Sequence, residues 1–291
     1  MKHFFTGLIF LFLAVTACGR LSNDDKKAGQ TTRIVCVSKQ INEYIYALGA
    51  EQDLVAVDLS STYPEKIKQL PNVGYHRALS AEGIISMKPT VVLHDGNIAP
   101  AAVIEQVKKV GIPLLEMHAG NGADSAKILM RQVAVYFHKE AAADSIIKKW
   151  DADMATALTD VGKNTGKIKP RILIIHYGRA ANIYLAMTKS STANQIIEWA
   201  GGVNAIDSVG DMARTNAEMI AKSAPDIIIA TDFGFDKFGS ANKFKEMPGV
   251  SLTPAAKNNR IYRIEENEIV YFGPRTPGVV KKVTEMIIGG K

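Results

Sequence analysis

Between Asp124 and Val161 the chain contains neither glycine nor proline, the two residues that most strongly disfavour helices. Apolar residues recur there at helical spacing: Ile128, Leu129, Val133 and Phe137, then Ile146, Ile147, Trp150, Met154 and Leu158. One helix of this length would span roughly 55 Å. The pattern weakens at Ala141–Ala143, so we expect one bent helix or two, the second starting near Lys139. Asp124 is the expected N-cap and Gly162 the expected C-terminal stop.

Similar segments lie on either side of this helical stretch. Residues 80–95 and residues 216–232 both contain a capping residue, Ala-Glu, a short helical run, a proline, a β-branched run and an aspartate. In each segment a glutamate, Glu82 or Glu218, precedes the proline by seven residues. Helix followed by strand at equal spacing indicates a repeated αβ unit, and hence two lobes joined by the helical stretch. Chance similarity is the alternative, since proline between helix and strand is common.

Elsewhere the chain alternates strand-like and helix-like segments, with glycine, proline and polar residues at most joins. The expected strands are residues 34–37, 54–57, 90–93, 113–116, 171–176, 226–231 and 259–263. The expected helices outside the central stretch are residues 42–48, 64–69, 82–87, 101–110, 192–200, 218–223 and 241–246. The sequence therefore predicts an α/β fold of two lobes with largely parallel sheets, bridged by a long helix. We expect an N-terminal lobe over residues 33–122, a linking helical segment over 123–165 and a C-terminal lobe over 166–291.

The N-terminus has the pattern of an export signal. Lys2 precedes an apolar run, Phe4–Val15, which is too short for a comfortable membrane span. Small residues then lead to Cys18, which resembles the lipobox of bacterial lipoproteins, where the cysteine is acylated and becomes the mature N-terminus. An ordinary cleaved signal peptide is the alternative. We expect a signal peptide over residues 1–17 and a flexible, lipidated tether over residues 18–32.

Several function classes are disfavoured by composition and motifs. The formal net charge of +6 is too weak and diffuse to argue for nucleic acid binding. The chain has no Cys/His metal cluster, Gly-x-Ser-x-Gly motif, phosphate loop or Gly-x-Gly-x-x-Gly motif. Cys36 lies in an expected buried strand and is interpreted as a core thiol. His94-Asp95 and Thr231-Asp232 end matching strands and could face a cleft, but one His–Asp pair does not make an enzyme.

The export signal, two αβ lobes and helical bridge together resemble the periplasmic binding proteins of bacterial ABC importers, in the class with a rigid linking helix. Residues 73–83, Val-Gly-Tyr-His-Arg-Ala-Leu-Ser-Ala-Glu-Gly, closely resemble a segment typical of haem-binding members. Ala200–Asn204 and Gly273–Thr276 are also similar to haem-family stretches, although Ala-Gly-Gly-Val-Asn recurs in siderophore and corrinoid relatives. The resemblance implies an importer component that binds ferric haem between its lobes and delivers it to a permease and ATPase. A ferric siderophore or corrinoid is the alternative cargo, and an enzyme or sensor on the same lobes is a third hypothesis.

The same resemblance implies that Tyr75 ligates the haem iron. A free phenol is mostly protonated at neutral pH, but ferric iron is a hard cation that favours phenolate. Arg77 is placed to stabilise that anion by a charge-assisted hydrogen bond. His76 stands where an apolar residue is usual, and either replaces Tyr75 as ligand or faces solvent. The alternative for Tyr75 is an aromatic side chain packed at a loop rim.

Other candidates come from the second lobe. His176 and Tyr177 follow an expected strand and are candidate second or distal ligands, although some family members use none. Arg179, Lys189 and Arg275 are candidate cations for the haem propionates, with Arg275 favoured. Surface solvation is the alternative for the other two.

The resemblance also gives the repeated glutamates a role. Glu82 and Glu218 match residues understood to dock on permease arginines, whereas the alternative is that each only interacts with its helix dipole. We expect a membrane-anchored lipoprotein of the bacterial cell envelope. It would face the periplasm, or the outer surface where there is no outer membrane.

Overall fold

The computed structural model describes residues 31–289 apart from residues 119, 121, 165, 167, 168 and 180. The expected signal peptide, Cys18 and nearly all of the tether therefore lie outside the described residues. Among the residues described, no helix is both long and apolar enough to cross a membrane.

The first lobe is built on a parallel sheet with strand order β2-β1-β5-β6. Every residue of β1 and β5 is buried, which explains their nearly continuous apolar sequences. The strands are β1 (Ile34–Cys36), β2 (Leu54–Val57), β5 (Val91–His94) and β6 (Leu114–Glu116). Around them lie α1 (Lys39–Ala47), η1 (Glu51–Asp53), η2 (Glu65–Gln69), α2 (Ala81–Ser86), α3 (Ala101–Lys109) and the hairpin of β3 (Gly74–Tyr75) and β4 (Ala78–Leu79).

The second lobe contains a mixed sheet with order β10-β8-β7-β11-β12, and β9 pairs with β7. Its parallel part consists of β7 (Arg171–Gly178), β9 (Val203–Asn204), β11 (Ile227–Thr231) and β12 (Ile261–Ile264). Two strands run antiparallel to their neighbours, β8 (Ile183–Met187) and β10 (Met212–Arg214). The two-lobed α/β fold with largely parallel sheets is therefore confirmed, but the β7–β8 hairpin was not predicted.

The helices of the second lobe are α6 (Thr192–Trp199), α7 (Ala217–Ser223), α8 (Asp232–Asp236), α9 (Ala241–Phe244), η3 (Val250–Leu252), α10 (Pro254–Lys257), α11 (Glu266–Ile269) and α12 (Thr276–Ile288). The sequence reading missed α12. A helix-start signal was present, because Pro277 lies in its first turn, where a missing backbone N–H costs nothing.

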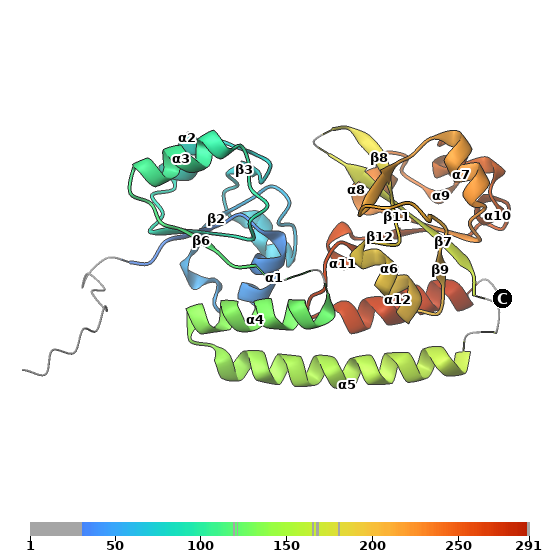
Figure 1. Cartoon of the computed structure of the whole chain (residues 1–291), viewed down its shortest axis with the longest axis horizontal. Helices are drawn as coiled ribbons and strands as arrows, with labels where there is room; N and C mark the ends of the chain where they lie inside the picture. The colour runs from blue at the N-terminus through green and yellow to red at the C-terminus, as the bar shows by residue number, and fades with distance from the viewer. Residues whose placement is uncertain are drawn as a thin grey trace, which may run out of the picture. The chain divides into compact units, whose positions relative to one another are not determined.

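The central helical stretch forms two helices that lie side by side, α4 (Ala123–Phe137) and α5 (Glu140–Asn164) (Figure 1). The chain turns between them at His138, which adopts a left-handed conformation. The break near Lys139 is thus confirmed. Both expected ends were wrong: Gly122 is the N-cap in place of Asp124, and α5 continues through Gly162. Asp124 instead lies in the first turn of α4, where its negative charge interacts favourably with the helix dipole. Gly162 lies in the last turn of α5, where glycine lowers helix stability by only about 1 kcal/mol relative to alanine.

Helix α5 connects the two lobes through its side chains. Ala143 and Ile147, near its start, belong to the hydrophobic core of the first lobe. Met154, Ala157 and Val161, nearer its end, belong to a core of the second lobe, where α5 packs on α12. One helix therefore has its two halves buried in different lobes, so the lobes are bridged by packing as well as by the chain.

The predicted αβ repeat is present in both lobes. In the first, Ser80 Oγ accepts the amide of Gly83 at 3.3 Å at the start of α2, which leads to the central strand β5. In the second, Asn216 Oδ1 accepts the amide of Met219 at 2.8 Å at the start of α7, which leads to the central strand β11. Each N-cap satisfies a helix-end amide, so both glutamates occupy equivalent first-turn positions.

Gly249 provides a stability prediction for the second lobe. Its φ is +88°, and a Cβ there would overlap the carbonyl oxygen of Ala217. Gly239 has a similar φ of +78°, but nothing lies within 4 Å of its Cβ position. Gly239→Ala should therefore cost only the left-handed backbone penalty of about 1–2 kcal/mol, and Gly249→Ala clearly more. Urea unfolding measures both variants, and equal losses would contradict the predicted steric overlap.

Candidate functional site

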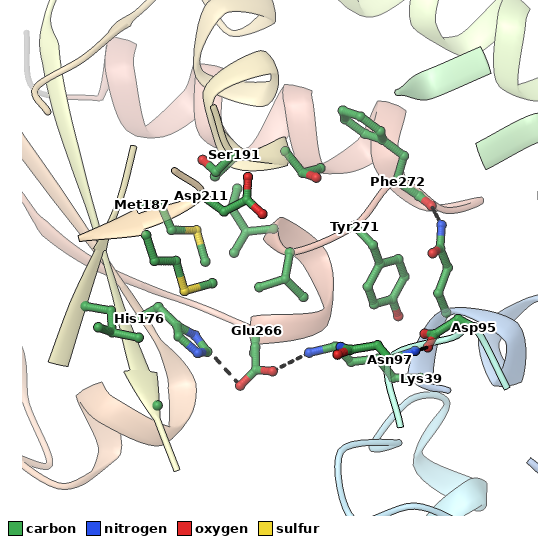
Figure 2. Close-up of a pocket in the computed structure, with 18 of the residues that line it drawn as sticks. Lys39, Asp95, Asn97, His176, Met187, Ser191, Asp211, Glu266, Tyr271 and Phe272 are labelled. Carbon is green, nitrogen blue, oxygen red and sulfur yellow. Dashed lines mark hydrogen bonds and ion pairs between the residues drawn. The ribbon is translucent and has the colours of Figure 1, made fainter. Parts of the chain in front are cut away.

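A cleft of about 540 Å³ is lined by side chains from both lobes (Figure 2). This volume lies in the range of small-molecule and cofactor sites. The first lobe contributes Lys39, Gln40, Tyr75, His76, Arg77, Asp95, Asn97 and His118. The second lobe contributes Ile183, Leu185, Met187, Met212, Ile269, Val270 and Phe272 as apolar lining, with His176, Ser190, Ser191, Asp211, Glu266 and Tyr271.

The two sides of the cleft differ in chemistry. Strand β8 presents Ile183, Leu185 and Met187 in an alternating pattern, so that one face of a strand forms an apolar wall. The first lobe supplies mostly polar, aromatic and cationic side chains. Such a site suits a ligand with a broad apolar face and polar or charged groups elsewhere.

The β3–β4 hairpin brings Tyr75, His76 and Arg77 to the cleft together. The rings of Tyr75 and His76 have their centroids 4.3 Å apart. Arg77 donates from Nε to Asn97 Oδ1 at 2.9 Å, which holds its guanidinium at the cleft. Among the interactions of the described residues, none joins Arg77 to the Tyr75 hydroxyl, so the expected phenolate contact is not made in this structure.

A buried carboxylate lies behind His76. Asp58 accepts from the Ser61 hydroxyl at 2.5 Å and from the Ser60 amide at 3.0 Å, and its Oδ2 is 3.4 Å from His76 Nδ1. Burial raises the pKa of Asp58, but hydrogen bonds from His76, Ser60 and Ser61 outweigh it, and the net pKa lies below its ordinary value. Asp58 is therefore an anion at neutral pH.

An ion pair joins the two lobes at the cleft. Lys39 Nζ at the start of α1 lies 2.5 Å from Oε1 of Glu266 in α11, and Oε2 lies 3.9 Å from His176 Nδ1 (Figure 2). Burial lowers the pKa of His176, against the opposing effect of Glu266, and its buried Nδ1 has no hydrogen-bond partner among the residues that the structure describes. Burial raises the pKa of Glu266, but Lys39 and His176 bring it below its ordinary value. The cleft thus contains a neutral imidazole beside a bridging ion pair.

Four other expected site residues do not line the cleft. The Tyr177 hydroxyl contacts Lys237 and Asn182. Arg179 lies 4.0 Å above the Phe233 ring and donates to the Leu59 carbonyl at 3.2 Å.

The other two are cations bound to carboxylates. Lys189 pairs with Asp207. Arg275 binds the buried carboxylate of Glu43 through Nε at 2.9 Å and Nη2 at 2.8 Å. These cations are engaged in protein contacts outside the cleft.

The strand-end aspartates have different positions. Asp95 lines the cleft and accepts from the Ser38 hydroxyl at 2.7 Å, whereas His94 is buried. Asp232 is buried and accepts the amide of Glu266 at 3.0 Å. Over the described part of the chain, no group of three or more His, Cys, Asp or Glu side chains is arranged to hold a metal ion.

Comparison with known proteins agrees with this architecture. The sequence profile of the periplasmic binding protein family matches residues 34–268. This chain belongs to that family. Members of this family are binding proteins rather than enzymes. They act outside the cytoplasm as the substrate-binding components of ABC transporters, and this role implies a permease and an ATPase as partners of this periplasmic binding protein.

Relatives of this periplasmic binding protein include an ABC transporter substrate-binding lipoprotein and a vitamin B12-binding protein. YvrC of Bacillus subtilis, named an uncharacterized ABC transporter substrate-binding lipoprotein, is 26% identical over 88% of this chain and 79% of its own. The vitamin B12-binding protein of Vibrio parahaemolyticus is 20% identical over 87% of this chain and 88% of its own.

Solved structures show the same fold. The apo periplasmic heme-binding protein RhuT from Roseiflexus sp. RS-1 aligns with a TM-score of 0.81 and 29% identity, over 90% of this chain and 99% of its own. The heme-binding protein BhuT, solved with two hemes, aligns with a TM-score of 0.79 and 27% identity, again over 90% and 99%.

Sequence reasoning missed Lys39, Asp58 and Glu266. A positional signal existed for the first two, because Lys39 follows β1 closely and Asp58 directly follows β2, at the carboxyl ends where clefts form. Glu266 has the same positional signal, because it follows the parallel strand β12 by two residues, but nothing local indicated its contact with Lys39 of the other lobe. Its role depends on α11, a single turn that packs near the first lobe only in the folded protein.

The side chain of His176 is only 12% exposed, and we expect it to make the stability of this periplasmic binding protein depend on pH. Because the folded-state pKa of His176 is lowered, the unfolded chain binds more protons as the pH falls past about 6.5. Stability conferred by neutral His176 is thus present above that pH and lost below it. Burial of His94 acts in the same direction.

Urea unfolding at pH 7.5 and pH 5.5 should therefore show a smaller acid-induced loss for His176→Gln than for the parent. Part of the loss should remain because of His94. An identical loss in the two proteins would contradict the predicted contribution of His176.

Proposed function

We propose that this periplasmic binding protein binds ferric haem in the cleft, with Tyr75 as iron ligand. The observation that carries the proposal is a phenol on the cleft rim facing a site whose other lobe presents an apolar wall. Ferric iron favours a phenolate oxygen, and the two flat faces of a porphyrin require apolar contact. Lys39 and Arg77, which both line the cleft, are the proposed cations for the propionates.

His176 is the proposed second ligand from the opposite lobe. It lines the cleft, burial keeps its imidazole neutral, and a neutral ring nitrogen is what iron coordination requires. Similarity to RhuT and BhuT, both named heme-binding proteins, supports the proposed cargo. Tyr177, Arg179 and Arg275 are not included, because their side chains are committed to contacts outside the cleft.

A corrinoid is the second candidate cargo, since vitamin B12-binding proteins match over most of this chain. Titration of the purified protein with hemin, and separately with cyanocobalamin, distinguishes the two. Hemin should shift the Soret band saturably and produce a phenolate-to-iron charge-transfer band. Saturable cobalamin binding without hemin binding would replace haem by a corrinoid. Binding of neither, with saturable binding of a ferric siderophore, would assign that cargo.

We also propose that Glu82 and Glu218 dock on the permease. Both are exposed in the first turn of equivalent helices, one in each lobe. The Glu218 side chain is 75% exposed and its contact with Lys222 at 2.7 Å is a surface ion pair within one helix. Such pairs contribute little stability, so Glu218 is free to exchange Lys222 for a permease arginine.

Glu82→Ala combined with Glu218→Ala should leave hemin affinity and folding intact. Transport into vesicles that hold the cognate importer should fall about ten-fold or more, equivalent to 1.4 kcal/mol shared by two charged contacts. Glu105→Ala combined with Glu246→Ala, an exposed glutamate from each lobe, is the matched control. Full transport by the first pair would refute docking through these residues.

For the N-terminus we propose acylation of Cys18 and membrane anchoring through the lipid. The small residues that precede Cys18 support this proposal, and YvrC is named a lipoprotein. Mass spectrometry should detect an acylated N-terminal peptide starting at Cys18. Cys18→Ser should release the protein from the membrane fraction.

A further inference from the structure

The Asp58–His76 pair beside Tyr75 provides a second kind of metal ligand on the same rim of the cleft. We propose that Tyr75 and His76 are an exchangeable ligand pair, in which the phenolate binds ferric haem iron and His76 Nε2 binds ferrous haem iron. Asp58 is the positioning residue for His76. This inference rests on the proposed haem function and extends it to the oxidation state of the cargo.

The first support is the way His76 is held. The Asp58 side chain is fully buried and that of His76 is only 13% exposed. His76 Nδ1 lies 3.4 Å from Asp58 Oδ2 and 3.4 Å from the Ser60 hydroxyl. A ring whose Nδ1–H faces a carboxylate carries its lone pair on Nε2, which is the arrangement of histidines that ligate metals. The ring lines the cleft, and within the described residues Nε2 has no hydrogen-bond partner.

The second support is the distance between the two candidate ligands. The rings of Tyr75 and His76 are 4.3 Å apart between centroids and tilted by 51°. The two rings therefore lie side by side on one hairpin, within reach of the same cargo. The apolar wall of Ile183, Leu185 and Met187 makes no directional bonds that would oppose a displacement of the cargo between the two rings.

The chemistry of iron distinguishes the two donors. Ferric iron is a hard cation and favours an anionic oxygen ligand, whereas ferrous iron is softer and binds an imidazole nitrogen favourably. On reduction, one electron from an external one-electron reductant enters the iron. The iron–oxygen bond to Tyr75 breaks, the phenolate takes a proton from water, and a bond from iron to His76 Nε2 forms. Hydrogen bonding to Asp58 makes the imidazole a stronger donor.

Resonance Raman spectroscopy of the full protein loaded with hemin and reduced anaerobically with dithionite tests the proposal. The measurement is made in a His176→Gln background, because His176 is itself a proposed iron ligand. In that background the reduced protein should show an iron–imidazole stretching band, and adding His76→Gln should abolish it. Adding His118→Gln, the same substitution at another histidine of the cleft, should retain the band. Asp58→Asn should shift the band to lower frequency, a change that a purely structural role of Asp58 would not produce.

The result that overturns the proposal is an iron–imidazole band that persists when His76→Gln is added to His176→Gln. Absence of the band in His176→Gln alone, with the band present in His76→Gln alone, would assign the ferrous ligand to the second lobe instead. Circular dichroism confirms that each variant is folded. The ferric spectrum separates the two levels of inference. A parent without the charge-transfer band contradicts the haem proposal, whereas a parent with that band whose His176→Gln variant shows no ferrous imidazole band contradicts only the ligand exchange.

Discussion

Tyr75→Phe removes the phenolate-to-iron charge-transfer band of the hemin complex and weakens hemin binding at least ten-fold, which corresponds to about 1.4 kcal/mol. The substitution deletes a single oxygen and leaves the ring that packs 4.3 Å from His76. Its effect therefore reports loss of the coordinate bond rather than loss of aromatic packing. Absorption titration with hemin gives both the band and the affinity.

The matched control is Tyr46→Phe, which removes a phenol oxygen outside the cleft, where Tyr46 lies beneath Lys66. This variant should bind hemin like the parent and keep the band. An unchanged spectrum and affinity in Tyr75→Phe would exclude Tyr75 as the ligand. His76, its neighbour on the same hairpin, would then be the candidate ligand of ferric iron.

Arg275→Met should destabilise the protein by about 3–5 kcal/mol, because it leaves a buried carboxylate without its counter-charge. Glu43 belongs to α1 of the first lobe, and its side chain is only 3% exposed. Arg275 precedes α12 of the second lobe and binds Glu43 through two nitrogens, at 2.9 and 2.8 Å, while the Tyr271 hydroxyl donates to Glu43 at 2.6 Å. These contacts connect the two lobes, so the loss should appear as reduced global stability in urea unfolding.

A surface arginine provides the control for this prediction. Arg263 also binds a carboxylate through two nitrogens, at 2.7 and 2.9 Å from Asp236, but the two side chains are 38% and 55% exposed. Arg263→Met should cost no more than about 1 kcal/mol, because exposed pairs are screened by water. The double variant Glu43→Gln with Arg275→Met should recover part of the Arg275→Met loss, since it removes the unpaired charge. Equal losses for the two arginine variants would contradict the argument from burial.

Short-range patterns in the sequence were sufficient to predict those helices and strands whose formation depends on residues close together in the chain. The buried strands β1, β5 and β11 read as apolar runs because both faces of a parallel sheet are covered. The two αβ units were visible because N-caps, first-turn glutamates and prolines are short-range features. The absence of glycine and proline between Asp124 and Val161 predicted the helical stretch, and the weakened apolar pattern at Ala141–Ala143 predicted a bend or break near Lys139.

The arrangement of the site required the tertiary structure. Tyr75, His76 and Arg77 were adjacent in the sequence, so one motif identified all three, and the hairpin carries them to the cleft together. Arg275 was expected to bind a haem propionate, but in the folded protein it binds the buried carboxylate of Glu43. Leaving that buried carboxylate without a counter-charge would cost free energy, which favours the pairing with Arg275.

The sequence alone thus determined the fold class, the repeated αβ unit and the Tyr75 motif, because periodicity, capping and motif spacing are properties of consecutive residues. The folded structure was needed to show that α4 and α5 lie side by side, that Lys39 reaches Glu266 across the cleft and that Asp58 lies behind His76. These contacts join residues of different elements, which in the case of Lys39 and Glu266 are 227 positions apart. They depend on which surfaces the packing of two lobes buries, and charge pairing and hydrogen bonding follow burial rather than sequence spacing.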